Sequence, residues 1–187
     1  MLRLATVPSR TAARARPAPA AAGSKVRVLG LDPGSRVTGF GLIEVCPRGA
    51  QYLASGGIRA GTGELAGRLL SMFKHVSELV AQHRPDEVAI ERVFMHANPD
   101  SALKLGQARG AALCAAAGGG APVFEYTPRE VKLTVTGTGA ADKEQVQHMV
   151  KALLGLSGRL GADAADALAI ALCHAQHRGL ALLVGSK

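Results

Sequence analysis

The stretch that decides the fold is VRVLGLDPGSRVTGFGLIEV, residues 26–45. Two apolar runs rich in strand-forming residues flank a Pro-Gly turn, which is typical of neighbouring β-strands. A third run of the same kind, QYLASGGIRA at residues 51–60, follows after a further glycine-bearing turn. Three short neighbouring strands joined by such turns predict an antiparallel meander.

Downstream of the meander the hydrophobic period changes from strand to helix. Residues 64–84 place apolar side chains on one helical face, and Pro85 closes the segment. The side chains expected to face inward there are Leu65, Leu69, Met72, Phe73, Val76, Leu79 and Val80. A strand at residues 87–91 comes next, followed by a helix of small residues from Asn98 to about Gly118.

The last third of the chain adds one strand and three helical segments. The strand is expected at residues 122–126, and the helices near Pro128, at 142–154 and at 162–176. The order βββ-α-β-α-β-α plus helices predicts an α/β fold, with a five-stranded mixed sheet flanked by helices.

The N-terminal residues differ in composition from the remainder. The chain has 22 Lys and Arg against 14 Asp and Glu, a net charge of +8. Residues 1–25 contain five of the basic residues, no acid and much Ala and Pro, so we expect a disordered arm. An Arg-rich, acid-free arm also resembles an organelle transit peptide, which is the alternative interpretation of these residues. The expected division is therefore this arm, one folded domain at 26–180 and a tail at 181–187.

Composition excludes several classes of protein. With 48% hydrophobic and 19% charged residues among 187, the chain can build one core and is neither a coiled coil nor a disordered chain. The chain contains no run of about 18 consecutive apolar residues, so the sequence predicts no membrane span. Cys46, Cys114 and Cys173 are odd in number and far apart, which argues against disulfides and thiolate zinc sites.

Four acidic residues lie where carboxylates are costly. Asp32 and Glu91 each end an apolar strand, and Asp163 and Asp166 open a helix that is apolar almost all round. An ionised carboxylate buried without a partner costs several kcal/mol, so each needs a cation, donors or a proton. Strand ends meet at one edge of a sheet, and the i, i+3 spacing puts both aspartates on one helix face. The sequence therefore predicts a four-carboxylate cluster.

Taken singly, each acid has a simpler interpretation. Asp32 belongs to an Asp-Pro-Gly turn sequence, and Glu91 could leave its strand into solvent. Asp163 and Asp166 fit a capping box, with Asp163 as the N-cap residue and Asp166 at the third helical position. Only the combination favours metal binding. Clustered carboxylates stay ionised when divalent cations neutralise them, and their hard oxygens favour Mg²⁺ or Mn²⁺.

Long strings of the sequence resemble, in order, the motifs of the RuvC family of bacterial Holliday-junction resolvases. They are LGLDPGSRVTG at 29–39, AIERVFM at 89–95, NPDSALKLGQARG at 98–110 and ADAADALAIA at 162–171. The resemblance spans about residues 26–177. It implies an RNase H-like fold and a crossover junction endodeoxyribonuclease. Such an enzyme acts in homologous recombination and DNA repair, nicking two strands of like polarity symmetrically and preferring thymine-rich sites.

The resemblance also implies roles and partners. Asp32, Glu91, Asp163 and Asp166 match the catalytic acids that bind two Mg²⁺ ions, for which Mn²⁺ can substitute. Two such ions activate a water and stabilise the leaving oxygen, giving 5′-phosphate and 3′-hydroxyl products. The implied partners are four-way junction DNA, a second copy of the chain in a homodimer, and the branch-migration proteins RuvA and RuvB, with no membrane.

Several residues are candidates for contacting DNA. The resemblance assigns Phe94 to bases near the junction centre, although buried core is the simpler interpretation of a phenylalanine. It also assigns Lys132 and Lys143 to the surroundings of the active site. The loop Thr136-Gly-Thr-Gly139 precedes a helix N-terminus and could offer N–H groups to phosphate, but it is not a Walker A loop. The further phosphate candidates are Arg92, Lys104, Arg109, Arg129 and Lys151.

Two other functions compete with the nuclease. Actin-like ATPases and sugar kinases share a strand-Asp-x-Gly sequence like that at Asp32, but they need two such domains and a cleft, which 187 residues cannot provide. A non-catalytic DNA-coating protein would use the acids only as caps and turns. It predicts that carboxylate-to-amide changes leave function intact.

Overall fold

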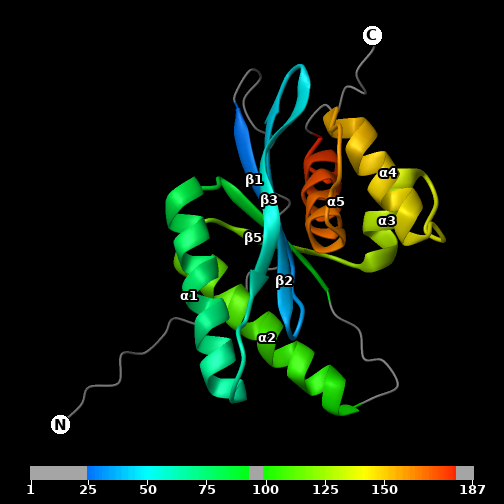
Figure 1. Ribbon diagram of the computed structural model, residues 1–187. Coiled ribbons are helices and arrows are strands. Elements are labelled where there is room, and N and C mark those ends of the chain that lie inside the picture. The colour runs from blue at the N-terminus through cyan, green and yellow to red at the C-terminus, as the bar shows by residue number, and fades with distance from the viewer. Residues whose placement is uncertain (1–24, 93–98, 180–187) are drawn as a thin grey trace, which may run out of the picture.

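A five-stranded mixed sheet forms the centre of the molecule (Figure 1). The computed structural model describes residues 25–92 and 99–179. The strands are β1 (Val26–Asp32), β2 (Val37–Cys46), β3 (Gly49–Arg59), β4 (Glu87–Glu91) and β5 (Val123–Tyr126), in the order β3-β2-β1-β4-β5. β1, β2 and β3 pair antiparallel, and β4 and β5 extend the sheet in parallel from β1. The predicted meander and mixed sheet are confirmed.

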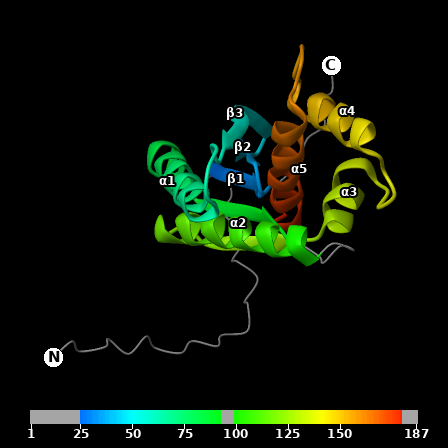
Figure 2. The same ribbon diagram turned by 60° about the horizontal axis from the view of Figure 1, so that its bottom comes forward.

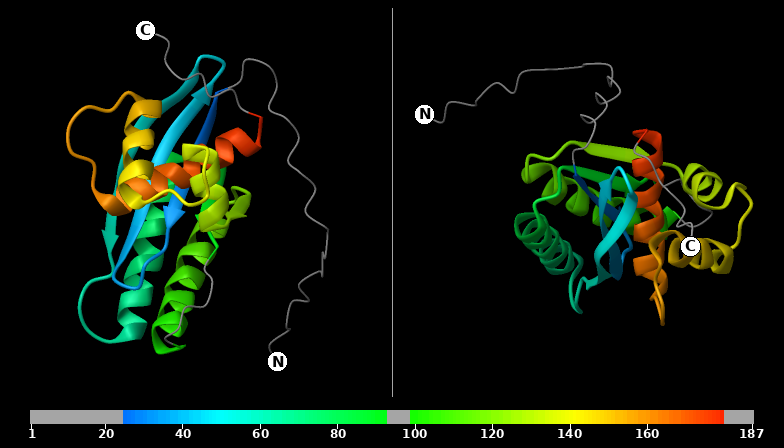
Figure 3. Two further views of the ribbon diagram at one scale, coloured as in Figure 1. Left: turned by 90° about the vertical axis from the view of Figure 1, so that its right-hand side faces the viewer. Right: turned by 90° about the horizontal axis from the view of Figure 1, so that it is seen from above.

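Helices cover both faces of this sheet (Figure 2). One face carries α1 (Leu65–His83) and α2 (Pro99–Gly118), and the other carries α5 (Ala162–His177). Outside α5 lie α3 (Pro128–Thr136) and α4 (Lys143–Leu154), as Figure 3 shows. The sheet thus separates two hydrophobic cores, one on each face.

The two cores follow the alternation of side chains along the strands. In β1, Leu29 and Leu31 belong to the core under α1 and α2, whereas Val28 belongs to the core under α5. In β4, Val88 and Ile90 face α1 and α2, and Ala89 faces α5. The side chains of odd-numbered residues in β4 and of even-numbered residues in β1 therefore point to the α5 face. This alternation assigns a face to every functional side chain on these two strands.

Glycines let α5 lie directly on the sheet. A Cβ atom on Gly30 of β1 would collide with the backbone of Ala167, and one on Gly39 of β2 would collide with the backbone of Asp163. A Cβ atom on Gly41 would meet Leu168 of the same helix. The helix itself contributes small residues, with six alanines among its buried positions. The absence of side chains at these three glycines brings the first turn of α5 against the ends of β1 and β2.

Most sequence-based element predictions are confirmed within a few residues. One inward assignment on α1 is wrong, because the side chain of Phe73 is 39% exposed while Met72 and Val76 next to it are buried. Residues 1–24 of the predicted arm at 1–25, the segment 93–98 with Phe94, and the predicted tail at 181–187 lie outside the described residues. Over the described part of the chain, no helix is long and apolar enough to cross a membrane.

Candidate active site

Two carboxylates end adjacent parallel strands at the same edge of the sheet. Asp32 is the last residue of β1 and Glu91 the last of β4, and Leu31 pairs with Ile90 just before them. Both side chains lie on the α5 face by the alternation of their strands. The two carboxyl groups lie close enough that the charge of Asp32 contributes to a raised pKa of Glu91. Two neighbouring carboxylates resist being ionised together in the absence of a cation.

The first turn of α5 adds the other two acids. Asp163 lies against β2 and β3, because its backbone abuts Gly39 and its carboxylate lies 3.9 Å from a Cβ built on Gly57. Asp166 follows three residues later and is half-buried. Both repel Asp32 electrostatically, and Asp166 also repels Glu91. The structure therefore brings all four predicted acids together.

Burial and mutual repulsion hold protons on this cluster. Burial first, and then the charges of Asp166 and Asp163, raise the pKa of Asp32 to about 6. Burial together with the charges of Asp32 and Asp166 raises the pKa of Glu91 to about 7. Burial also raises the pKa of Asp166, although Lys143 opposes this shift. A site whose acids are this reluctant to ionise has an excess of negative charge that a cation would relieve.

The capping interpretation of Asp163 and Asp166 is wrong. The N-cap residue of α5 is Gly161, with no side-chain hydrogen bond to the helix, and the helix begins at Ala162. Asp163 is thus the second helical residue, where its carboxylate is not needed as a cap. True capping boxes occur at the two preceding helices, through Thr127 with Glu130 and Asp142 with Gln145. The acids of α5 are therefore free to serve another purpose.

The four carboxylates are suitable ligands for magnesium, although they do not yet surround a common point. Among residues 25–92 and 99–179, no three acidic, histidine or cysteine groups already converge as ligands around one point. Asp166 Oδ2 lies 3.7 Å from Lys143 Nζ, so one of the acids already has a cation beside it. Four carboxylates with neither sulfur nor imidazole among them are the oxygen donors that Mg²⁺ and Mn²⁺ prefer. The chemistry of these residues therefore fits such ions.

Two of the predicted basic residues lie beside the acids. Lys143, in the first turn of α4, has a side chain that is 83% exposed. Its positive charge opposes the rise in the pKa of Asp32, Glu91 and Asp166. Lys132, on α3, also lowers the pKa of Asp166. Both lysines come from the helices outside α5, so they approach the cluster from one side. Both lysines lie near the four acids, and their contact with DNA stays a prediction.

The other basic candidates lie in different surroundings. Arg92 Nε is 4.0 Å from Glu125 Oε2, and Lys104 forms an exposed ion pair with Asp100 one helical turn away. Arg129 packs against Gly139, and Lys151 is in the last turn of α4. Arg109 is 18% exposed and is bonded within the protein rather than held out to solvent. Contacts of these residues with phosphate stay predictions, and Phe94 lies outside the described residues.

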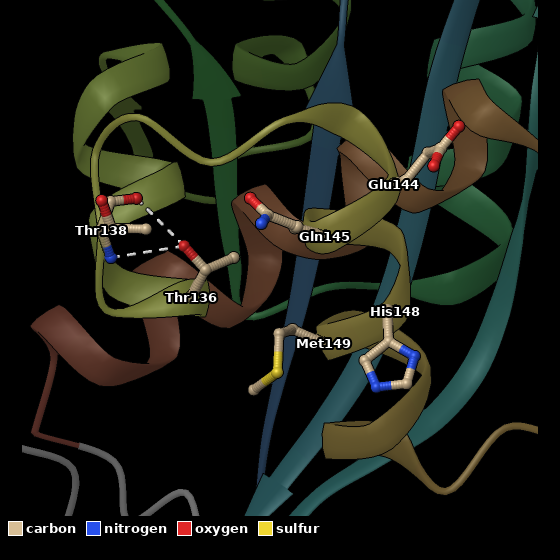
Figure 4. A pocket seen from close by; sticks show the side chains of 6 residues that line it. All are labelled: Thr136, Thr138, Glu144, Gln145, His148 and Met149. Atoms are coloured by element: carbon tan, nitrogen blue, oxygen red, sulfur yellow. Dashed lines mark hydrogen bonds between the residues drawn. The ribbon is translucent and has the colours of Figure 1, made fainter.

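The Thr136–Gly139 loop is less open to phosphate than its sequence indicates. The N–H of Thr138 donates to Thr136 Oγ1, and Asp142 caps the N-terminus of α4 with its own negative charge. A hollow of about 440 Å³ lies between the loop and α4 (Figure 4). His148 and Met149 line it, and Glu144 points away from the threonines. None of the four acids lines this hollow, so it is separate from the acidic cluster.

Sequence analysis missed a polar network on the α5 face. His174 is fully buried, and its Nε2 lies 2.6 Å from Glu87 Oε2 while its Nδ1 lies 2.8 Å from the Tyr126 hydroxyl. Arg178 binds both oxygens of Glu87. No local pattern signals this network, because its members come from β4, β5 and α5.

A second missed contact lies on the opposite face. Arg68 of α1 donates a hydrogen bond to the main-chain carbonyl of Ser35, in the turn that follows Asp32. This bond anchors the turn between β1 and β2 to α1. The turn is thus held from the side of the sheet that does not carry the acids.

The strand order, the meander followed by two parallel strands, and acids on β1, β4 and the last helix define an RNase H-like α/β protein. Comparison with known families narrows this class. The family model described as crossover junction endodeoxyribonuclease RuvC matches residues 28–174. The chain belongs to the RuvC family.

Individual relatives agree with this membership. The crossover junction endodeoxyribonuclease RuvC of Marinobacter nauticus is 62% identical over 79% of this chain and 85% of its own. The structure of Thermus thermophilus RuvC in complex with a Holliday junction substrate has a TM-score of 0.75 and 37% identity, covering 80% of this chain and 93% of that one. The yeast mitochondrial Holliday junction resolvase shares the fold, with a TM-score of 0.58, 13% identity and coverage of 83% and 81%.

Proposed function

We propose that this protein is a magnesium-dependent endonuclease that resolves four-way DNA junctions by paired, symmetric nicks. The observation that carries the proposal is the meeting of four acids, Asp32, Glu91, Asp163 and Asp166, at one edge of the sheet. The pKa values of Asp32 and Glu91 are raised there, and a bound cation would favour loss of their protons. Membership of the RuvC family and the junction complex of the Thermus thermophilus relative support junction DNA as the substrate.

The chain's own residues would hold and orient the reacting groups. Two bound Mg²⁺ ions would supply water activation and stabilisation of the departing 3′-oxygen, leaving a 5′-phosphate. Asp32 and Glu91, whose pKa values are raised, would lose their protons when the ions bind and would offer their oxygens as ligands. Asp163 and Asp166 would close the site from α5. Lys143 would offset the negative charge that the scissile phosphate adds to the four carboxylates.

The proposed setting follows from the same family. A homodimer would place two such sites on the two strands of like polarity. RuvA and RuvB would be the branch-migration partners, in bacterial recombination and repair in the cytoplasm. Phe94, Lys132 and Lys143 would contact the DNA, with weaker phosphate contacts from Arg92, Lys104, Arg129 and Lys151.

The direct experiment compares two substrates. Purified protein is incubated with a synthetic four-way junction and with a linear duplex of the same sequence, in Mg²⁺ or in EDTA. We expect paired nicks in the junction only, in Mg²⁺ only, with ligatable 5′-phosphate ends. The Asp32→Asn variant should bind the junction and leave it uncut.

The outcomes separate the parts of the proposal. Equal cutting of junction and duplex would contradict junction specificity, and cutting in EDTA would contradict the requirement for a metal. Full activity in Asp32→Asn would favour a protein that uses its acids only as caps and turns.

A further inference from the structure

Arg109 on α2 makes two hydrogen bonds that its sequence does not predict. Its Nε donates to the main-chain carbonyl of Glu91 at 3.0 Å, and its Nη2 donates to Glu125 Oε2 at 2.7 Å. Glu91 is the last residue of β4, and its carbonyl is therefore at the point where the sheet ends. The guanidinium ties the helix to the backbone of a proposed metal ligand.

The approach of Arg109 is from behind the active site. Ala108 and Ala112, on either side of it along α2, are buried in the core on the α1 and α2 face. Glu125 pairs with Ile90 in the sheet, and both face that same core side. The Glu91 carboxylate points to the opposite face, toward α5. Arg109 therefore binds the end of β4 from the α1 and α2 face of the sheet, whereas the four acids lie on the α5 face.

The charge of Arg109 is already matched inside the protein. Its side chain is 18% exposed and that of Glu125 is 28% exposed, so the pair is partly desolvated. A charge-assisted bond of 2.7 Å in such a setting is strong. Arg109 would have to break this pair, and release the strand, to reach a phosphate. Two fixed bonds to neighbouring strands are typical of a residue that holds backbone in place.

Small side chains make the reach possible. The four buried residues of α2 are all alanines, whose short side chains belong to the core between this helix and the sheet. Tyr126 completes the junction of the strands, because its carbonyl accepts the N–H of Arg92 at 2.7 Å. The end of β4 is thus bonded to β5 through its backbone and to α2 through Arg109. These contacts fix the backbone at Glu91.

We propose that Arg109, paired with Glu125, is a positioning residue that fixes Glu91 for metal binding through its main-chain carbonyl, and is not a phosphate contact. The inference rests on the proposed function, since it concerns the same site. Outer partners of metal ligands typically contribute about 10- to 100-fold in metal affinity or activity. A phosphate contact instead contributes to DNA binding and to its dependence on salt.

The test compares Arg109→Gln with wild type in two measurements that do not require cleavage. Binding of Mn²⁺ to the protein without DNA is followed by electron paramagnetic resonance, and binding of a four-way junction is followed in EDTA over a range of salt concentrations. We expect Mn²⁺ affinity to fall about tenfold, while junction affinity stays within about twofold and its salt slope is unchanged. Junction cleavage at saturating DNA should fall about 10- to 100-fold.

Two further variants and a control guard against misfolding. Glu125→Gln keeps the bond from Arg109 to the Glu91 carbonyl, so it should affect Mn²⁺ binding less than Arg109→Gln does. Arg109→Lys should be intermediate, because lysine keeps the charge and loses the planar fork. Lys74→Gln removes an exposed cation from α1 and should match wild type in both assays. Circular dichroism melts check that each variant is folded.

The opposite pattern would overturn the inference. Weaker junction binding with a salt slope reduced by about one, at unchanged Mn²⁺ affinity, would make Arg109 a phosphate contact. Wild-type behaviour in both assays would remove any role. If the wild-type protein neither binds Mn²⁺ nor cleaves the junction, the proposed function itself is contradicted. Failure of the proposed function is therefore distinct from failure of the inference about Arg109.

Discussion

Two glutamates four residues apart on β4 have pKa values that are shifted in opposite directions. Glu87, at the start of the strand, and Glu91, at its end, share the α5 face of the sheet. Burial alone would raise the pKa of Glu87, but bonds from His174 and Arg178 outweigh it and lower that pKa. Burial raises the pKa of Glu91 to about 7, and neighbouring acids reinforce the shift. One strand therefore carries a compensated carboxylate and an uncompensated one.

The difference shows which end of the sheet is built for stability and which for chemistry. At Glu87 the protein supplies its own cation and satisfies both carboxylate oxygens. At Glu91, burial and the charges of Asp32 and Asp166 outweigh the opposing charge of Lys143, so full compensation must come from outside the protein. Functional sites commonly hold such unresolved charge, because binding or catalysis makes use of it. The following predictions test this contrast, from the largest expected effect to the smallest.

The largest effect is expected at the uncompensated end. Glu91→Gln removes a proposed metal ligand that contributes several kcal/mol to the transition state, so junction cleavage should fall about 1,000-fold. Binding of the junction in EDTA should be retained, since fewer negative charges then oppose the phosphates. Gel-shift and cleavage assays on the same preparation measure both. Cleavage within tenfold of wild type would show that Glu91 is not a ligand.

The compensated end should respond in stability rather than in activity. Glu87→Gln breaks the buried ion pair with Arg178, and breaking a buried pair in this way costs about 3 kcal/mol of unfolding free energy. Urea denaturation measures the loss. The variant should still cut the junction at 25 °C, because Glu87 lies at the other end of β4. An unchanged denaturation midpoint would mean that the network adds nothing to stability.

The close contact of α5 with β2 should be sensitive to one added methyl group. In Gly39→Ala the new Cβ would collide with the backbone of Asp163, so the first turn of the helix must move away from the sheet. Overpacking of this kind costs about 2 kcal/mol, and cleavage should also fall because Asp163 is displaced from Asp32. Gly67→Ala, on α1 where a Cβ meets open space, is the matched control. Equal stability and activity of the two variants would contradict this packing argument.

The smallest effect is a difference in pH dependence without metal. A pKa raised from 4.5 to about 7 means that folded Glu91 keeps its proton longer than the unfolded chain does. This contribution to stability is present below about pH 4.5 and is lost as the pH rises through 7. Glu91→Gln should therefore gain about 1 kcal/mol on the wild type between pH 4.5 and 8, allowing for solvent screening.

Glu87 should show the reverse sign. Its lowered pKa contributes stability at neutral pH that is lost as the pH falls and the carboxylate is protonated. Thermal melts of wild type, Glu87→Gln and Glu91→Gln in EDTA from pH 4 to 8 compare the two directly. Parallel curves for all three proteins would contradict the assigned difference between the two ends.

The acids could be predicted from the sequence because their context is local. Asp32 and Glu91 each end an apolar run, and Asp163 and Asp166 lie in an apolar helix, so their convergence follows from period and order, although Asp163 itself is exposed. The start of α5 was the weaker point. A carboxylate three residues ahead of another also fits a capping box, and only the observed N-cap at Gly161 separates the two interpretations.

Partners brought together by the fold could not be predicted. Arg109 reads as a cation on a helix, and nothing near it in sequence reveals that Glu125 and the carbonyl of Glu91 take up its donors. His174 likewise gains its role from Glu87, which is 87 residues away along the chain. The glycines of β1 and β2 suggest turns or flexible strands, whereas their function is to admit α5. Contacts of high sequence separation leave no periodic signal.

The central claim is that the uncompensated acids hold divalent cations. It is tested most directly by titrating Mn²⁺ into wild type, Glu91→Gln and Glu87→Gln without DNA and measuring free Mn²⁺ by electron paramagnetic resonance. We expect wild type and Glu87→Gln to bind with the same affinity, releasing protons near pH 7, and Glu91→Gln to bind at least about tenfold more weakly. Equal Mn²⁺ binding by all three proteins would contradict the account.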